Sequence, residues 1–162
     1  MSTVLSSPED LAILLDAPAP LIGLDLGSKT IGVAVSDRLR GIASPRETVK
    51  RTKFAADAER LLEIAKTEKA AGFVLGLPIN MDGSQGPRVQ STNAFARNLS
   101  KLTDLPILLW DERLSTAAVE RLLIEADRSR ARRAKLVDKM AAAWILQGAL
   151  DRLAGIRRAA GG

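Results

Sequence analysis

The sequence predicts an α/β fold in which a mixed five-stranded sheet, three antiparallel meander strands plus two parallel strands, carries helices on both faces. The first observation is the almost wholly apolar run Leu21–Leu26, which is typical of a strand covered on both sides. Bulky and small residues then alternate over 31–35, and Pro45 within 41–51 marks an edge strand. From residue 54 onward helical and apolar segments alternate, which adds further strands in parallel.

Local signals set the remaining elements. Helices are expected where apolar residues recur at helical spacing, and Pro87 suits the first position of one of them. Strands are expected where short apolar runs stand alone. The predicted helices are 54–70, 87–102, 115–126 and 134–156, and the predicted parallel strands are 73–76 and 105–110. This order of elements is the ribonuclease H-like arrangement.

A chain of 162 residues is expected to form one main domain. We place that domain at 20–156, with an N-terminal extension at 1–19 and a C-terminal tail at 157–162. The extension contains a short helix that starts at Pro8, and we assign it no function. The N-terminus lacks the basic start of a signal peptide and no run approaches a membrane span, so a soluble cytoplasmic protein is expected.

Composition excludes several kinds of chemistry. The chain has no cysteine and no histidine, which excludes disulfides, thiolate zinc sites and Ser-His triads. Aromatic residues make up only 3%, which disfavours recognition of nucleic-acid bases by stacking. Hydrolytic chemistry in this chain must therefore rest on carboxylates, lysines and a hard metal ion.

The positive charge is concentrated in the last third. Residues 113–162 carry 11 Lys and Arg against 5 Asp and Glu, whereas residues 1–112 carry 13 against 14. A basic region of this kind suits contact with a polyanion. A solubilising helix face would have the same composition, and charge alone does not separate the two.

Three acidic residues fall where the predicted sheet would gather them. Asp25 lies on the first strand, Glu112 just past the strand 105–110, and Asp138 in the first turns of the last helix, beside the small residues Ala141 and Ala142. Three carboxylates suit Mg²⁺ or Mn²⁺, and two ions about 4 Å apart could activate a water and stabilise the leaving oxygen of a phosphodiester. Taken singly, Glu112 could pair at the surface with its neighbour Arg113, and Asp138 could complement a helix dipole.

Basic residues surround these acids along the chain. The Gly-rich segment 76–88 should lead from a strand end into a helix N-terminus, a favourable place for phosphate, although it could be an ordinary connection. The segment 127–135 is interpreted as a basic hinge loop that contacts a nucleic-acid backbone. The candidate phosphate-binding residues are Lys29, Arg88, Arg113, Arg132, Arg133, Lys135 and Lys139.

Four blocks together make the chain resemble the YqgF/RuvX family. They are GLDLGSKTIGVAVSD at 23–37, GLPINMDGSQGP at 76–87, DERLST at 111–116 and KLVDKMAAAWILQ at 135–147. The resemblance spans about 21–153 and implies a ribonuclease H-like nuclease. The acidic residues of the family match Asp25, Glu112 and Asp138 of this chain. The resemblance also implies a role in maturing the 5′ end of pre-16S rRNA, with partners in ribosome assembly. An older implication is resolution of Holliday junctions in branched DNA.

The expected function is thus metal-dependent hydrolysis of phosphodiester bonds. Two other classes stay open. DLGSKTIGVAVSD also resembles the phosphate loop of actin-like phosphotransferases, although such enzymes clamp a nucleotide between two domains. A non-catalytic RNA-binding assembly factor would use the basic last third and would bind RNA without needing Asp25. A dinucleotide-binding enzyme is disfavoured, because no G-x-G-x-x-G follows a strand.

Overall fold

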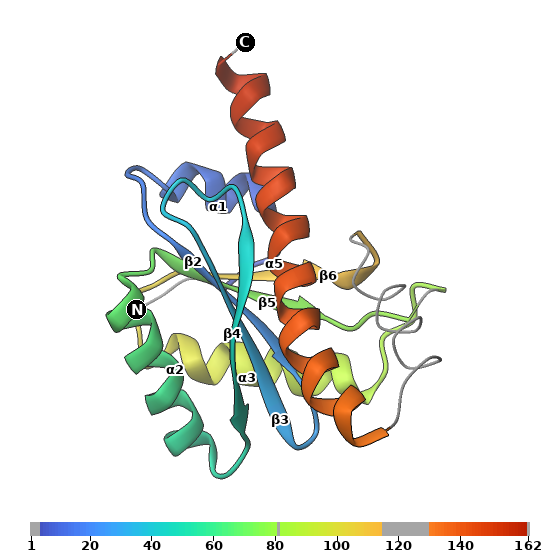
Figure 1. Ribbon diagram of the computed structural model, residues 1–162. Coiled ribbons are helices and arrows are strands. Elements are labelled where there is room, and N and C mark those ends of the chain that lie inside the picture. Colours follow the sequence, from blue (N-terminus) through green and yellow to red (C-terminus); the bar gives the residue numbers. More distant parts are fainter. Residues whose placement is uncertain (1–3, 81, 115–129, 162) are drawn as a thin grey trace.

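The computed structural model describes residues 4–80, 82–114 and 130–161, without the side chains of 130–139. Its centre is one sheet of six strands in the order β1-β6-β5-β2-β3-β4 (Figure 1). The strands are β1 Val4–Leu5, β2 Leu21–Leu26, β3 Thr30–Ser36, β4 Ala43–Lys50, β5 Gly72–Leu77 and β6 Ile107–Asp111. The predicted count of five strands was wrong by one, because a two-residue strand such as β1 carries no periodicity that a sequence can display.

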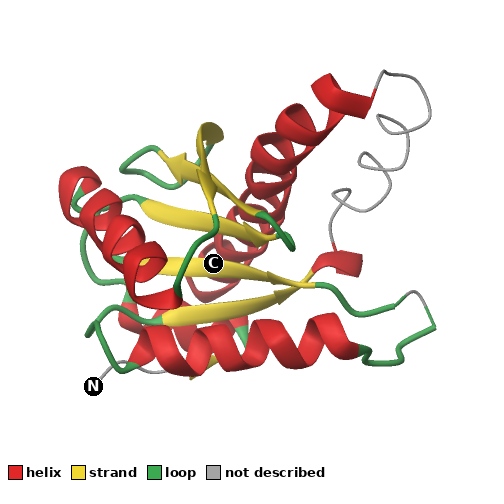
Figure 2. Cartoon of the chain, turned by 90° about the horizontal axis from the view of Figure 1, so that it is seen from below, coloured by secondary structure: helices red, strands yellow, loops and turns green. Residues whose placement is uncertain are grey.

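Helices cover both faces of the sheet, as predicted (Figures 1 and 2). The helices are α1 Pro8–Leu14, α2 Phe54–Glu68, α3 Pro87–Ser100, the single 3₁₀ turn η1 Glu112–Leu114, and α5 Arg130–Gly161. One core layer joins α1 and α5 to the sheet, and the other contains buried residues of α2 and α3. The helix predicted at 115–126 lies outside the described residues.

Strand directions agree with the predicted mixed sheet. β2 pairs antiparallel with β3, and β3 pairs antiparallel with β4, whose Pro45 lies on the edge strand as expected. β5 runs parallel to β2, and β6 runs parallel to β5. Because β2, β5 and β6 share one direction, their carboxyl ends lie at the same edge of the sheet.

Residues 4–14, before the predicted domain start, are part of this packed body. Val4 pairs in register with Ile107 at the far edge of the sheet. Leu5 and Leu11 are buried in the core layer that α5 forms with the sheet. The domain start at residue 20 stays a prediction, but β1 and α1 contribute core residues.

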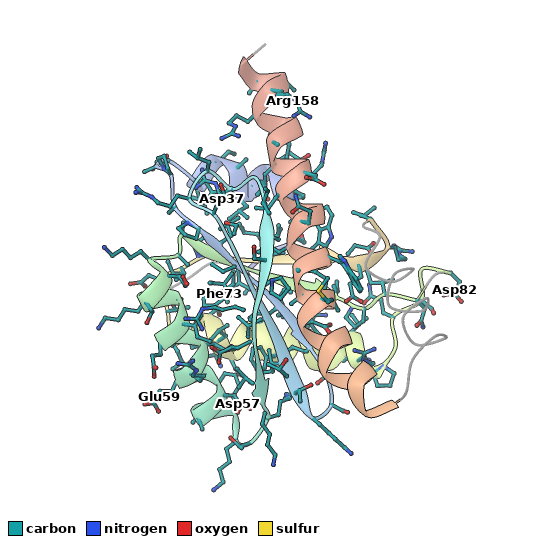
Figure 3. All side chains as sticks on the ribbon, in the orientation of Figure 1. Asp37, Asp57, Glu59, Phe73, Asp82 and Arg158 are labelled. Carbon is teal, nitrogen blue, oxygen red and sulfur yellow. The ribbon has the colours of Figure 1, made fainter. Side chains whose placement is uncertain are left out.

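The last helix is longer than predicted at both ends. α5 begins at Arg130 and ends at Gly161, and Figure 3 places Arg158 where it extends past the sheet. Residues 130–135 are therefore helical, and the interpretation of 127–135 as a loop was wrong for that part. Arg, Ala and Lys are strong helix formers, so the charge run does not interrupt the helix. No helix in the described ranges is long and apolar enough to cross a membrane.

Candidate active site

Asp25 and Glu112 come from two strands that end at the same edge of the sheet. Asp25 is the fifth residue of β2, and Glu112 opens η1 directly after β6. Both carboxylates are withdrawn from water, with 5% of Asp25 and 7% of Glu112 exposed. Burying a carboxylate is costly unless it has compensating partners. Two such residues at one sheet edge therefore mark a candidate site.

Gly76 of β5 lies between the two acidic strands. β5 pairs with β2 on one side, where Leu24 is level with Leu75, and with β6 on the other, where Gly76 is level with Trp110. A Cβ built on Gly76 would stand 3.1 Å from Oε1 of Glu112. The carboxylate of Glu112 thus occupies the space above Gly76. Because neighbouring strands are about 4.8 Å apart, this space adjoins Asp25.

Both acidic side chains belong to the sheet face that α5 covers. Gly23 lies two residues before Asp25 on the same face, and a Cβ there would stand 2.7 Å from Cβ of Leu146 and 3.0 Å from the carbonyl oxygen of Ala142. On β6, Leu108 and Trp110 belong to the same layer, and Glu112 continues their alternation. The backbone of α5 therefore passes directly over the strands that carry the acids.

The small residues of α5 allow this close approach. Ala141 and Ala142 are fully buried, in agreement with the expectation that this face of the helix is small-sided. Position 138 is four residues before Ala142 and seven before Ile145, which packs on Gly76, so the three positions share one helix face. The side chain of Asp138 lies outside the described residues.

The donor set fits a hard divalent cation. Carboxylate oxygens are the ligands that Mg²⁺ and Mn²⁺ prefer. A Cβ at position 76 would crowd one such oxygen, Oε1 of Glu112. Among the residues whose side chains the structure describes, no three acidic groups lie close enough to hold a metal ion. Asp138, the expected third ligand, is not among those residues.

Arg113 pairs with Asp111 rather than with Glu112. Nε of Arg113 donates to both carboxylate oxygens of Asp111 at 3.1 Å, and Nη2 donates to Oδ2 at 2.7 Å. The backbone N–H of Arg113 also donates to Asp111 at 3.0 Å. These hydrogen bonds lower the pKa of Asp111 and raise the pKa of Arg113. Arg113 therefore forms its surface ion pair with Asp111, and not with Glu112 as the alternative interpretation required. The side chain of Glu112 is buried instead.

The loop after β5 is held by its own side chains. Asn80 donates to the Ser84 hydroxyl at 2.9 Å, and Ser84 donates to Asp82 through its N–H at 2.9 Å and its hydroxyl at 2.6 Å. The bonds from Ser84 lower the pKa of Asp82. Gly83 has φ of +90°, and Figure 3 shows Asp82 on the side of the molecule where β6 ends. These groups are engaged within the loop.

The six predicted basic residues other than Arg113 divide into two groups. Lys29 lies exposed in the turn after β2, and Arg88 lies exposed in the first turn of α3, where its Nη2 donates to the carbonyl oxygen of Leu26 at 3.3 Å. Both are therefore near the strand end that carries Asp25. The side chains of Arg132, Arg133, Lys135 and Lys139 lie outside the described residues.

Arg51 is a basic residue of this region that sequence reasoning missed. Its Nη1 donates to the carbonyl oxygen of Gly27 at 2.7 Å, and its backbone N–H donates to Lys29 at 2.8 Å. Thr30 pairs with Lys50 in the β3–β4 ladder. The antiparallel meander therefore brings residue 51 beside the turn after Asp25, and no pattern in the sequence indicated this contact.

Comparison with known proteins identifies the family. The model of the RuvX family, described as Holliday junction resolvase, matches residues 19–152. The chain belongs to the RuvX family. A protein of Rhodobacter capsulatus named "Putative pre-16S rRNA nuclease" is 63% identical over 94% of this chain and 96% of its own length. A Bradyrhizobium protein of the same name is 70% identical over 85% of this chain and 86% of its own length.

Solved structures confirm the predicted fold class. A Thermus thermophilus RuvC in complex with a Holliday junction substrate superposes with a TM-score of 0.52, covering 83% of this chain and 96% of that one. Its sequence is 14% identical, so this likeness speaks for the fold alone. The RuvX chain thus has a ribonuclease H-like fold of the RuvC kind.

Proposed function

We propose that this RuvX protein is a metal-dependent nuclease that hydrolyses phosphodiester bonds at the 5′ end of precursor 16S rRNA. The observation that carries the proposal is the placement of Asp25 and Glu112 on either side of Gly76, in a buried space that a side chain at 76 would fill. The family match and the names of the close relatives support a nuclease acting on nucleic acid.

Asp25, Glu112 and Asp138 would hold Mg²⁺ or Mn²⁺. When bound, such ions supply the positive charge that activates a water and stabilises the oxygen leaving phosphorus. The protein fixes the carboxylates by burial. β2 and β6 set their separation, and α5 closes the space above them. Position 138 shares a helix face with Ala142, and this periodicity supports the third assignment.

Basic residues beside the acids would position the substrate. Lys29 and Arg88 flank the strand end that carries Asp25, so each can meet a phosphate close to the cleaved bond. Arg113 is engaged at two points by Asp111, which holds η1 and hence Glu112 in place while leaving Nη1 for a phosphate. Arg132, Arg133, Lys135 and Lys139 would extend the contact along α5. Backbone contacts of this kind orient the strand without reading its sequence.

A second substrate class comes from the family description, which is Holliday junction resolvase. Both substrates use the same chemistry, so a direct comparison decides between them. A precursor 16S 5′-end RNA and a four-way DNA junction are offered to the protein side by side, with Mg²⁺ and with Mn²⁺. Cleavage of the RNA in preference to the junction supports the proposal, and the reverse preference assigns the resolvase function.

The same assay tests the non-catalytic alternative. An assembly factor would bind the RNA with strong salt dependence and would leave both substrates intact under either metal. That result, with binding unchanged in Asp25→Asn, would contradict the nuclease proposal. Partners in ribosome assembly would then be sought through the basic last third of the chain.

A further inference from the structure

A cavity of about 280 Å³ opens beside the strand end that carries Asp25. Its walls come from three elements that are far apart in the sequence: the turn after β2, the first turns of α3 and the residue that follows β4. The polar residues in its wall are Ser28, Arg51, Arg88, Ser91 and Thr92. Gly27 in the turn contributes no side chain, so the cavity reaches the backbone two residues after Asp25.

Both arginines are anchored to this turn by hydrogen bonds to its carbonyl oxygens. Arg51 donates from Nη1 to Gly27 at 2.7 Å, and Arg88 donates from Nη2 to Leu26 at 3.3 Å. The guanidinium carbon of Arg51 also lies 5.9 Å from the centre of the Phe95 ring, within reach of a cation–π interaction. Each guanidinium is thus oriented, and its remaining N–H groups are left for another acceptor.

Neither arginine has a carboxylate partner among the described residues. Four other arginines there do: Arg46 and Arg60 pair with Glu47, Arg113 pairs with Asp111, and Arg152 pairs with Glu9. Two like charges that line one cavity repel each other. An anion between them would remove that repulsion, and a guanidinium matches the oxygens of a phosphate with two parallel hydrogen bonds.

We propose that this cavity binds one phosphate group of the nucleic-acid strand, next to the cleaved bond, and that Arg51 is its principal new residue. The inference rests on the proposed nuclease function and deepens it. Gly27 in the cavity wall follows Asp25 by two residues, about 7 Å of extended chain, so the cavity opens beside the strand end that carries this carboxylate. No aromatic face is offered to a base, since the Phe95 ring is engaged by Arg51 and Phe54. The site therefore positions the backbone and does not read sequence.

The test compares three variants in which a neutral glutamine replaces an arginine. Arg51→Gln and Arg88→Gln each remove one charge from the cavity. Because glutamine is shorter than arginine and gives up the hydrogen bond to the backbone of 26–27, urea titration first establishes that each variant is folded. Arg97→Gln removes the same charge from the exposed last turn of α3 and is the matched control. Binding of a single-stranded precursor 16S 5′-end RNA is measured in EDTA, without cleavage, over a series of salt concentrations.

If the cavity binds a phosphate, each cavity variant should weaken RNA binding about tenfold. The plot of log association constant against log salt concentration should become less steep by about 0.7, the value for one phosphate contact to a single strand. The control keeps the wild-type slope. An RNA with one methylphosphonate next to the cleaved bond should bind wild type as weakly as normal RNA binds Arg51→Gln, with no further loss when the two changes are combined. In the cleavage assay, KM should rise more than kcat falls.

Two failures are distinguishable. If wild type cleaves the RNA but Arg51→Gln and Arg88→Gln match the Arg97→Gln control in slope and affinity, the phosphate site is overturned and the nuclease function stands. If wild type cleaves neither RNA nor junction, the nuclease proposal fails. In that case, if the salt dependence of RNA binding in EDTA is the same for the cavity variants as for wild type, the phosphate site is overturned as well. If the cavity variants show a weaker salt dependence, the cavity is retained as an RNA-binding site.

Discussion

Glu112 occupies the space that Gly76 leaves open on the neighbouring strand. A Cβ on Gly76 would stand 3.1 Å from Oε1 of Glu112 and 2.5 Å from Cδ1 of Ile145. The absence of a side chain at this one position therefore lets the last helix press on the sheet and lets a glutamate fold back beside Asp25. The candidate site depends on this missing side chain as much as on its carboxylates.

Gly76→Ala should abolish most of the cleavage activity. The added methyl group would displace Glu112 and Ile145, and overpacking of this kind costs about 1–3 kcal/mol of stability. The measurement is kcat on the precursor RNA together with the free energy of unfolding from urea titration.

Gly72→Ala is the matched control for that change. Gly72 lies at the other end of the same strand, where a Cβ would stand 3.0 Å from the carbonyl oxygen of Pro106. This variant should lose comparable stability and keep its kcat per folded molecule. Equal loss of kcat in both variants would show that general loosening, and not the position of Glu112, controls activity.

Mn²⁺ should stabilise the folded protein and change the emission of Trp110. This indole is buried, is level with Gly76 in the sheet, and has no hydrogen-bond partner for Nε1 among the described residues. Ligand at about 100 times its dissociation constant adds about 2.7 kcal/mol, or about 5–10 °C in Tm for a chain of this size. Trp144→Phe leaves Trp110 as the single indole.

The Mn²⁺ effects should disappear in Asp25→Asn and reverse with EDTA in the parent protein. A Tm increase of equal size in Asp25→Asn would mean that the ion binds elsewhere. This experiment measures only the binding of Mn²⁺, so its result does not depend on the identity of the natural substrate.

The Asp111–Arg113 pair should make stability depend on acidity. The hydrogen bonds from Arg113 hold the pKa of Asp111 below its ordinary value, so the unfolded state binds protons more readily than the folded state. The stabilisation is therefore complete above about pH 4 and is lost as the pH falls through the folded pKa. Asp111→Asn should flatten this part of the curve of unfolding free energy against pH. An unchanged curve would show that other carboxylates set the acid sensitivity.

Leu11→Ala should destabilise the protein although it lies outside the predicted domain. Leu11 is fully buried in α1, and such truncations cost about 2–5 kcal/mol. Ile13→Ala on the same helix removes a side chain that is 75% exposed and should change stability by less than about 0.5 kcal/mol. Equal Tm values for the two variants would mean that α1 does not contribute to the core.

Much of the fold could be predicted because strong local signals agreed with the tertiary arrangement. β2 coincides with the apolar run Leu21–Leu26, and α3 begins at Pro87 as its fixed φ favours. β1 could not be predicted, because two residues show no period and the strand forms only by pairing with β6.

The sequence was enough to predict which carboxylates form the candidate site. It was not enough to predict which residues pack around them. Asp25 stood out as the only charge in an apolar strand. The burial of Glu112 depends on Gly76 and Ile145, which are far apart in the sequence. Arg51 was missed because its relation to Gly27 arises from the pairing of two hairpin strands, and a single basic residue after a strand has no pattern of its own.

The most direct test of the account is the rate of RNA cleavage by Asp25→Asn. Wild type, Asp25→Asn and the control Asp37→Asn are compared on precursor 16S 5′-end RNA with Mg²⁺ and with Mn²⁺. Asp37 lies at the opposite end of the β2–β3 pair, where it accepts two backbone hydrogen bonds of 2.8 Å from Gly41 and Ile42. We expect wild type and Asp37→Asn to cleave, and Asp25→Asn to fold with at least wild-type stability and show no cleavage. Cleavage by Asp25→Asn at the wild-type rate would contradict the active site proposed at this edge of the sheet.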